Sequence, residues 1–147
     1  MVNKLKPVFH YIKIALLVLI VTCIIVGPFM TVAYVNSQAR IALREAKNVK
    51  LAFEMLTVEY YGLGRVIYKP DSPNGLASGV QERIDQLMEK DTNVQLVSYK
   101  TETREVIKFI YENEHYRVIY DVSNQAEENW TVDYILPVLK YGEHEKE

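Results

Sequence analysis

The chain has 147 residues, which is room for one small domain and an accessory segment rather than for two full cores. All 19 acidic residues and 14 of the 17 basic residues follow the N-terminal apolar run, so the rest of the chain has a net charge of −5. This acidic balance argues against a nucleic-acid-binding protein, which needs a basic surface to replace the counterions of the phosphates.

An apolar run of membrane-spanning length lies near the N-terminus. It reads IKIALLVLIVTCIIVGPFMTVAY over residues 12–34, and Lys13 is its only charge. About 20 apolar residues in a helix cross the hydrocarbon core of a bilayer, and a soluble helix is seldom apolar on every face. Gly27 and Pro28 predict a kink, which membrane helices tolerate. We predict a transmembrane helix over residues 12–35, with the lipid bilayer as its partner.

The fate of this segment has three interpretations. The first is a retained signal anchor. It would provide a fixed support for the helical pattern that resumes directly after the apolar run. A cleaved signal peptide would end near Ala33, where Thr31 and Val32 complete a small-residue cleavage site, and would release a secreted protein. A lipoprotein anchored on Cys23 is disfavoured, because Thr22 is a poor residue before a lipidated cysteine. The retained anchor is the leading prediction.

The N-terminal tail, residues 1–11, bears on orientation because its only charges are basic, Lys4 and Lys6. The positive-inside rule then predicts a cytoplasmic N-terminus, although Arg40 and Arg44 closely follow the apolar run on its other side. We predict a single-pass protein of the cell membrane with an extracytoplasmic C-terminal domain.

A second apolar pattern follows the run, now on one face of a helix. Its members succeed one another at alternating steps of four and three: Val35, Ala39, Ala42, Ala46, Val49, Phe53, Leu56 and Tyr60. Gly62 and Gly64 end the pattern, since glycine readily adopts the left-handed conformation of a helix C-terminus. The stripe has two interpretations. It packs under a sheet of the same chain, which we favour, or it forms a self-associating coiled coil with a shallow alanine seam.

The rest of the chain predicts a loop, a short helix and four strands. Residues 65–79 are rich in Pro, Gly, Ser, Asn and Asp and predict an exposed loop. Ser78 is placed to cap the helix, with Gln81 in the capping-box position. The apolar side of that helix is Val80, Ile84, Leu87 and Met88. The strand segments show two-residue alternation and are residues 94–100, 105–112, 115–123 and 130–136.

Short connections between these strands predict an antiparallel meander. The meander has one apolar face and the long helix has one apolar stripe, so laying one on the other closes a two-layer α+β domain over residues 36–140. Residues 141–147 predict a disordered tail. Most of the 11 tyrosines are expected in the core, and three remain candidates for exposed positions: Tyr99, Tyr111 and Tyr141.

The sequence shows no motif for catalysis, cofactor binding or metal binding. The three histidines are scattered and have no cysteine ligands beside them. Phosphate loops, nucleophile elbows and metalloprotease motifs are absent. The acidic residues Glu127, Glu128 and Asp133 are more typical of a solvated loop than of a calcium site. We therefore predict no enzyme activity, no cofactor, no metal and no small-molecule substrate.

The segment AYVNSQARIALREAKNVKLAFEMLTVEYYG resembles the helical stem of type IV pilins and type II secretion pseudopilins, where a tyrosine shortly precedes an Ala-Arg pair and an alanine-rich turn leads to a terminal Tyr-Tyr or Tyr-Gly. The match covers residues 34–62, and beyond it the order of elements agrees. In this family a processing signal would place the cleavage point near His10 and Tyr11 and a glutamate near Ala15. This sequence has neither feature at those positions, so the processing signal is missing. The resemblance implies a pilin-like fold that a prepilin peptidase does not process.

The leading functional prediction is a membrane-anchored, pilin-like protein with a structural, assembly or partner-binding role, related to a pilus or a secretion system. Its partners would be other membrane or pilin-like proteins, or further copies of itself. The alternative is a small extracytoplasmic sensor or ligand-binding module, which a pocket of convergent polar groups on the sheet would favour.

Overall fold

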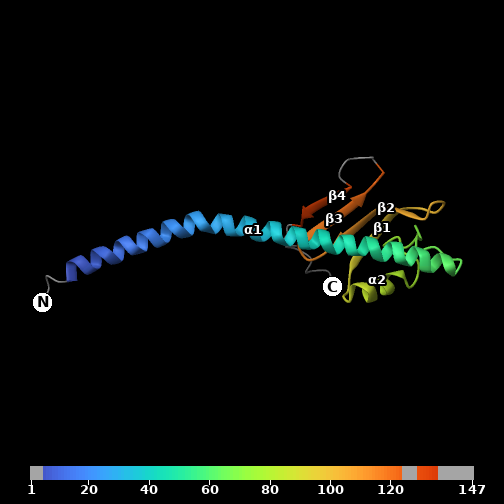
Figure 1. The fold of residues 1–147 in the computed structure, drawn as a ribbon, viewed down its shortest axis with the longest axis horizontal. Coiled ribbons are helices and arrows are strands. Elements are labelled where there is room, and N and C mark those ends of the chain that lie inside the picture. The colour runs from blue at the N-terminus through green and yellow to red at the C-terminus, as the bar shows by residue number, and fades with distance from the viewer. Residues whose placement is uncertain (1–4, 124–128, 136–147) are drawn as a thin grey trace, which may run out of the picture. The chain divides into compact units, whose positions relative to one another are not determined.

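The computed structural model describes residues 5–123 and 129–135, with side chains from residue 11 onward. The elements in these ranges are α1 (Leu5–Gly62), α2 (Val80–Met88), β1 (Asn93–Lys100), β2 (Glu105–Glu112), β3 (Tyr116–Asp121) and β4 (Trp130–Tyr134) (Figure 1). The predicted α+β class is confirmed, because a long N-terminal apolar helix is combined with a small antiparallel sheet. The chain divides into two compact units between Gln38 and Ala39. The predicted tail, residues 141–147, lies outside the described residues.

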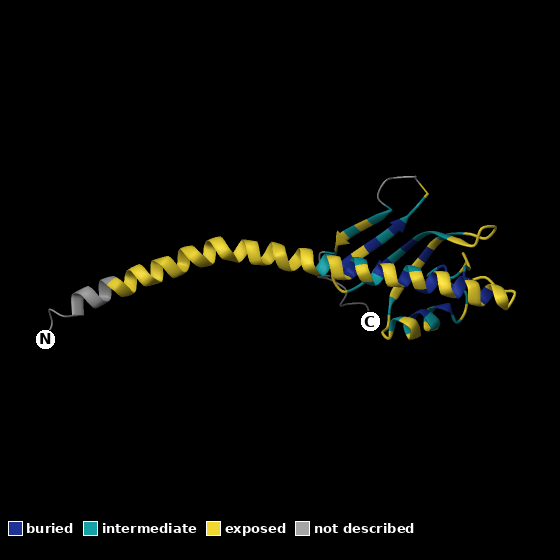
Figure 2. Cartoon of the chain, viewed as in Figure 1, coloured by how far each residue is buried: buried dark blue, intermediate teal, exposed yellow. Residues whose placement is uncertain are grey.

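In the described residues, the first unit consists of the N-terminal part of α1. Residues 11–37 are solvent-exposed although most of them are apolar (Figure 2). Within the described ranges, α1 is the helix long and apolar enough to cross a membrane. The hydroxyls of Thr22 and Thr31 donate to backbone carbonyls one turn back, at 2.8 and 3.0 Å, so both are satisfied inside the helix. Gly27 and Pro28 lie within α1, and the kink there stays a prediction.

The second unit contains a four-stranded antiparallel sheet in the order β1-β2-β3-β4, which is the predicted meander. The strand ends lie at most two residues from the predicted ones. Cross-strand pairing aligns an apolar row: Leu96 faces Phe109, Phe109 faces Tyr120, and Tyr120 faces Trp130. Ring centroids are 5.4 Å apart for Phe109 and Tyr120 and 4.7 Å apart for Tyr120 and Trp130. The row gives the sheet one face that must be kept from water.

The stripe of α1 supplies the cover for this face. Six of the predicted stripe residues are at most 8% exposed: Ala42, Ala46, Val49, Phe53, Leu56 and Tyr60. The Phe53 ring meets the Phe109 ring edge-on, with 5.3 Å between centroids. Ala39 is partly buried against the same cluster. Of the two interpretations of the stripe, the structure places it in the core of its own chain.

The loop between the helices is not simply exposed, as its composition predicted. Ile67 and Leu76 are fully or almost fully buried, and the loop lies against β1, where the Leu96 amide donates to the Asn74 carbonyl at 2.8 Å. Gly75 has a φ of 71°, and a Cβ added there would come within 1.8 Å of the Leu96 carbonyl oxygen. Pro, Gly, Ser and Asn predict irregular backbone, which is a different property from exposure.

The start of α2 also differs from the prediction. Gly79, with a φ of 83°, occupies the N-cap position in place of Ser78, and no side chain caps the helix. Gln81 instead donates to the Thr92 carbonyl at 2.8 Å. Asp85 accepts from the Thr92 amide and hydroxyl at 2.8 and 2.6 Å. The polar residues of α2 therefore fix its connection to β1 rather than its N-terminus.

The core assignment predicts very different effects for two apolar residues of α1. Phe53→Ala removes a fully buried ring and should lower the free energy of unfolding by about 3–5 kcal/mol. Val58→Ala, at a site that is 72% exposed, should change it by less than about 0.5 kcal/mol. Urea unfolding of the full chain in detergent measures both values. Equal losses would contradict the burial of the stripe under the sheet.

Candidate functional site

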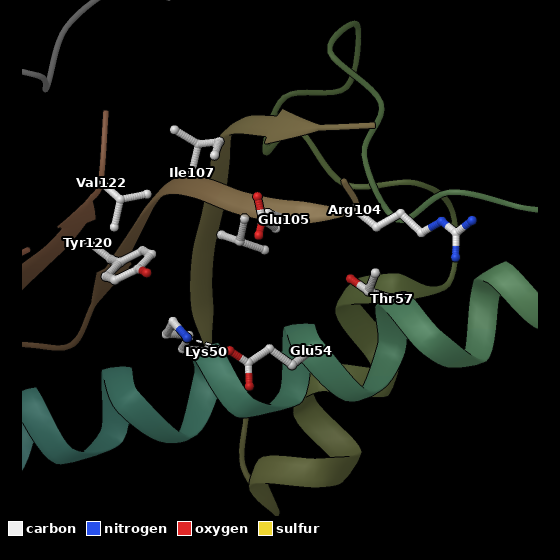
Figure 3. Close-up of a pocket in the computed structure, with 9 residues that line it drawn as sticks. Lys50, Glu54, Thr57, Arg104, Glu105, Ile107, Tyr120 and Val122 are labelled. Carbon is white, nitrogen blue, oxygen red and sulfur yellow. Dashed lines mark hydrogen bonds and ion pairs between the residues drawn. The ribbon is translucent and has the colours of Figure 1, made fainter. Parts of the chain in front are cut away.

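A cleft of about 360 Å³ opens between α1, the N-terminal end of β2 and the C-terminal end of β3 (Figure 3). Its lining combines charged, hydroxyl and apolar side chains: Lys50, Glu54, Thr57, Arg104, Glu105, Val106, Ile107, Tyr120 and Val122. All of these residues belong to the second unit. Ligand pockets have volumes of roughly 300–1,000 Å³, so the cleft has room for a small molecule.

Helix geometry brings three polar side chains to one wall of the cleft. Lys50, Glu54 and Thr57 are spaced by four and three residues, so they lie on one face of α1. Figure 3 shows them along the helix, with Tyr120 and Glu105 on the opposite side. At this end of the sheet β2 begins with a carboxylate rather than a large apolar side chain. The strand ends are thus lined by polar as well as apolar groups.

Thr57 carries an unsatisfied hydroxyl at this cleft. The residue is 8% exposed, and its Oγ1 atom is buried with no hydrogen-bond partner among the described residues. Thr22 and Thr31 of the same helix donate one turn back, which is the usual bond of a helical threonine. An unpaired buried hydroxyl costs about 1–3 kcal/mol. Thr57 therefore marks a position where a polar partner is missing.

Arg104, in the turn between β1 and β2, also lines the cleft. Its φ is 58°, a left-handed conformation that arginine rarely adopts. Its Cζ atom lies 3.2 Å from the centroid of the Tyr61 ring, so the guanidinium is held against an aromatic face. None of the ion pairs within the described ranges involves Arg104. A neighbouring hollow of about 260 Å³ shares Thr57 and Arg104 with the cleft and adds Arg65.

The charges that line the cleft balance one another. Lys50 pairs with Glu54, and its Nζ atom lies 5.5 Å from the centroid of the Tyr120 ring. The hydrogen bond to Glu54 raises the pKa of Lys50 against the opposing effect of burial. Arg104 and Glu105 contribute one more positive and one more negative group. The cleft therefore offers cationic and anionic groups in one small space without a net charge.

A different polar cluster joins α1, the turn after α2 and β2. The Glu45 carboxylate accepts from Lys90 Nζ at 2.6 Å and from the Tyr111 hydroxyl at 2.7 Å. Lys90 Nζ also donates to the Tyr111 hydroxyl at 3.1 Å. Burial opposes ionisation of Glu45, but the bonds from Lys90 and Tyr111 outweigh it and hold the pKa of this carboxyl below its ordinary value. Since the three groups hydrogen-bond to one another, the cluster clamps the fold.

The predicted surface tyrosines illustrate what the sequence left open. Tyr111, a candidate for an exposed position, is 1% exposed and contributes to the clamp, so it does not belong to the exposed set. Its strand is apolar on both faces, with Ile110 next to it, so alternation alone did not identify the inner face. Tyr99 is partly buried, and Tyr141 lies outside the described residues, as do Glu127 and Glu128.

An exposed apolar surface lies on the helices of the second unit. Leu51 and Met55 of α1 are 55% and 59% exposed, Val58 follows three residues on, and Leu87 of α2 is exposed as well. Leu51, Met55 and Leu87 line one shallow hollow. We call these four residues the outer apolar face. Contiguous exposed apolar side chains are typical of interaction surfaces.

Comparison with known proteins finds no match to the chain among protein-family models, curated proteins or solved structures. Its function is therefore inferred from its own residues.

The Glu45 clamp predicts a defined dependence of stability on pH. A lowered pKa in the folded state means that ionised Glu45 stabilises the fold above its ordinary pKa of 4.5 and that this contribution is lost as the pH falls below it. Glu45→Gln should therefore lower the free energy of unfolding at neutral pH, and its difference from wild type should shrink between about pH 5 and about pH 3.

Urea unfolding across this pH range measures the effect. Glu102→Gln, in the exposed turn between β1 and β2, is the matched control and should follow wild type at every pH. A Glu45→Gln deficit that stays constant down to the lowest pH would show that the carboxylate charge does not stabilise the clamp.

Proposed function

We propose that the chain is a single-pass membrane protein that carries a pilin-like α+β domain with a structural, assembly or partner-binding role. In this proposal the N-terminus is cytoplasmic and the domain lies outside the cytoplasm. One observation carries the proposal: α1 is apolar and exposed over residues 11–37, and the same helix contributes the core stripe of the following domain.

The exposed apolar part of α1 supports the membrane anchor. Removing one large aliphatic or aromatic side chain from water is worth about 1.5–3 kcal/mol, and residues 11–37 hold a long series of such side chains with no protein cover in the described structure. Lipid would cover all of them. Because α1 continues without interruption to Gly62, the anchor and the domain core are parts of one helix.

The outer apolar face supports the assembly role. Its side chains are spaced along α1 and α2 on a surface that the core does not use. A membrane anchor would hold all copies in one orientation and raise their effective concentration, so a modest contact suffices for association. The stem resemblance to pilins and pseudopilins points to the same role, without the processing signal of that family.

A specific observation favours a second candidate function, a ligand-binding module. The cleft brings Lys50, Glu54, Thr57, Arg104 and Glu105 to one small space, and one of these groups lacks a partner. A small molecule that raises the unfolding temperature at constant protein concentration would distinguish ligand binding from a purely structural role.

The orientation in the membrane is tested with a single exposed thiol. Lys100→Cys, at an exposed position outside the outer apolar face, is introduced in a Cys23→Ser background, which removes the only native cysteine. We expect a membrane-impermeant maleimide to modify the K100C protein in intact cells and to leave the C23S parent unmodified. Modification only after the cells are opened would contradict an extracytoplasmic domain. The intact mass of the same sample reports whether the residues before Tyr34 are retained.

The assembly role is tested by crosslinking through the outer apolar face. Met55→Cys in the Cys23→Ser background should form disulfide-linked dimers in membranes on mild oxidation, since position 55 would lie at the contact. Adding Leu51→Asp should reduce the dimer fraction, because a charge then enters an apolar contact. Lys100→Cys, exposed at the end of β1, is the control. Equal crosslinking at positions 55 and 100 would contradict a specific contact.

A further inference from the structure

The Thr57 end of the cleft has the groups that bind a carboxylate. Arg104 has a planar guanidinium whose face rests on Tyr61 at 3.2 Å from its Cζ atom to the ring centroid. This stacking fixes the plane and leaves the N–H edges available, the geometry in which arginine binds carboxylates with two hydrogen bonds. The Thr57 hydroxyl lines the same cleft and is a buried donor without an acceptor among the described residues. A bound carboxylate would satisfy both groups.

The opposite charge is available on the same cleft. Glu105 accepts one hydrogen bond, from the Thr103 hydroxyl to its Oε2 atom at 2.8 Å, and its Oε1 atom has no donor in the described ranges. Glu54 on α1 is paired with Lys50 through one carboxylate oxygen. Both carboxylates therefore keep acceptor capacity for an ammonium group, which has three donors to place.

An apolar wall completes the cleft. Val106, Ile107 and Val122 line it together with the ring of Tyr120, and the first three are partly exposed. A volume of about 360 Å³ is near the lower end of the range of ligand pockets. The cleft thus fits a small molecule with an aliphatic part, and a drug-sized or polymeric ligand would not be enclosed by it.

Charge decides between the classes of small ligand. A simple anion would meet Glu54 and Glu105, and a simple cation would meet Lys50 and Arg104, so either would be partly repelled. A zwitterion pairs with both sets. We propose that the cleft binds a free α-amino acid with an aliphatic side chain, its carboxylate on Arg104 and Thr57, its ammonium on Glu105 and Glu54, and its side chain on Val106, Ile107 and Val122.

This inference deepens the ligand-binding candidate and does not depend on the membrane anchor, because every group that it uses lies in the second unit. A negative result in the binding experiment below would overturn the amino-acid site, whereas a negative result in the labelling experiment would overturn the orientation of the anchor. The two failures are therefore distinguishable.

The test is calorimetric titration of the full chain in detergent with three matched probes. L-leucine carries both charges, 4-methylpentanoate lacks the ammonium, and 3-methylbutylamine lacks the carboxylate. We expect L-leucine to bind with a Kd of about 1 mM or tighter and each half-probe to bind about tenfold more weakly or not at all. No binding of L-leucine, or equal binding of L-leucine and either half-probe, would overturn the proposal.

Two variants remove the groups that would bind the carboxylate of the ligand, the Thr57 hydroxyl and the Arg104 guanidinium. Thr57→Val replaces an unpaired hydroxyl with a methyl group, so the unliganded variant should unfold at the same or a higher temperature. Arg104→Gly relieves a left-handed backbone, since glycine adopts a φ of 58° without strain. Both should lose about tenfold or more in affinity for L-leucine.

The control shares the backbone change but lies outside the cleft. Glu89, after α2, has a φ of 54° and does not line the cleft. Glu89→Gly should therefore bind L-leucine as tightly as wild type. Wild-type affinity in both Thr57→Val and Arg104→Gly would overturn the proposed carboxylate site, and so would an equal loss in Glu89→Gly.

Discussion

The burial of one face of α1 under the sheet is the constraint on which the second unit depends. Exposing the aromatic inner row of the four-stranded meander to water would be unfavourable. The apolar stripe of α1 packs on this row and buries it. Ala42 and Ala46 are fully buried, and their small side chains let the helix lie close to the sheet. Lys47 and Lys50 hold their ammonium groups 6.0 and 5.5 Å from the ring centroids of Trp130 and Tyr120, so their stems shield the edge of the contact.

The side chains of α1 that lie outside the buried stripe do not contribute to the core and can make other contacts. One flank places Lys50, Glu54 and Thr57 at the cleft. Another part of the surface carries the outer apolar face, with Leu51 and Met55. Glu45 of α1 binds Lys90, which follows α2, and Tyr111 of β2, and so joins these three segments. Core packing, a candidate binding site and a candidate contact surface therefore share a single helix, separated by its 3.6-residue period.

The sequence predicted the elements well because their periods are strong: the four-three stripe of α1 and the alternation of the strands became the observed helix and meander. It did not predict the cleft. Lys50 and Glu54 have the spacing of an ordinary surface ion pair, and a helical threonine usually bonds to its own helix, so nothing local marks Thr57. Arg104 gives no sequence sign of a left-handed backbone either. These properties arise only when a turn in the sheet approaches α1, which is a tertiary event.

The approach of Gly75 to β1 affects the exposed edge of the sheet. A free strand edge is a template on which another molecule can add a strand, and crowding on a surface makes such pairing more frequent. Here the Leu96 amide donates to the Asn74 carbonyl, and the Tyr68 hydroxyl donates to the Val97 carbonyl at 3.3 Å. A side chain at position 75 would clash with the Leu96 carbonyl and displace the loop from β1. Gly75 thus allows the loop to cover part of the β1 edge of the sheet, which makes this edge less available for pairing with another strand.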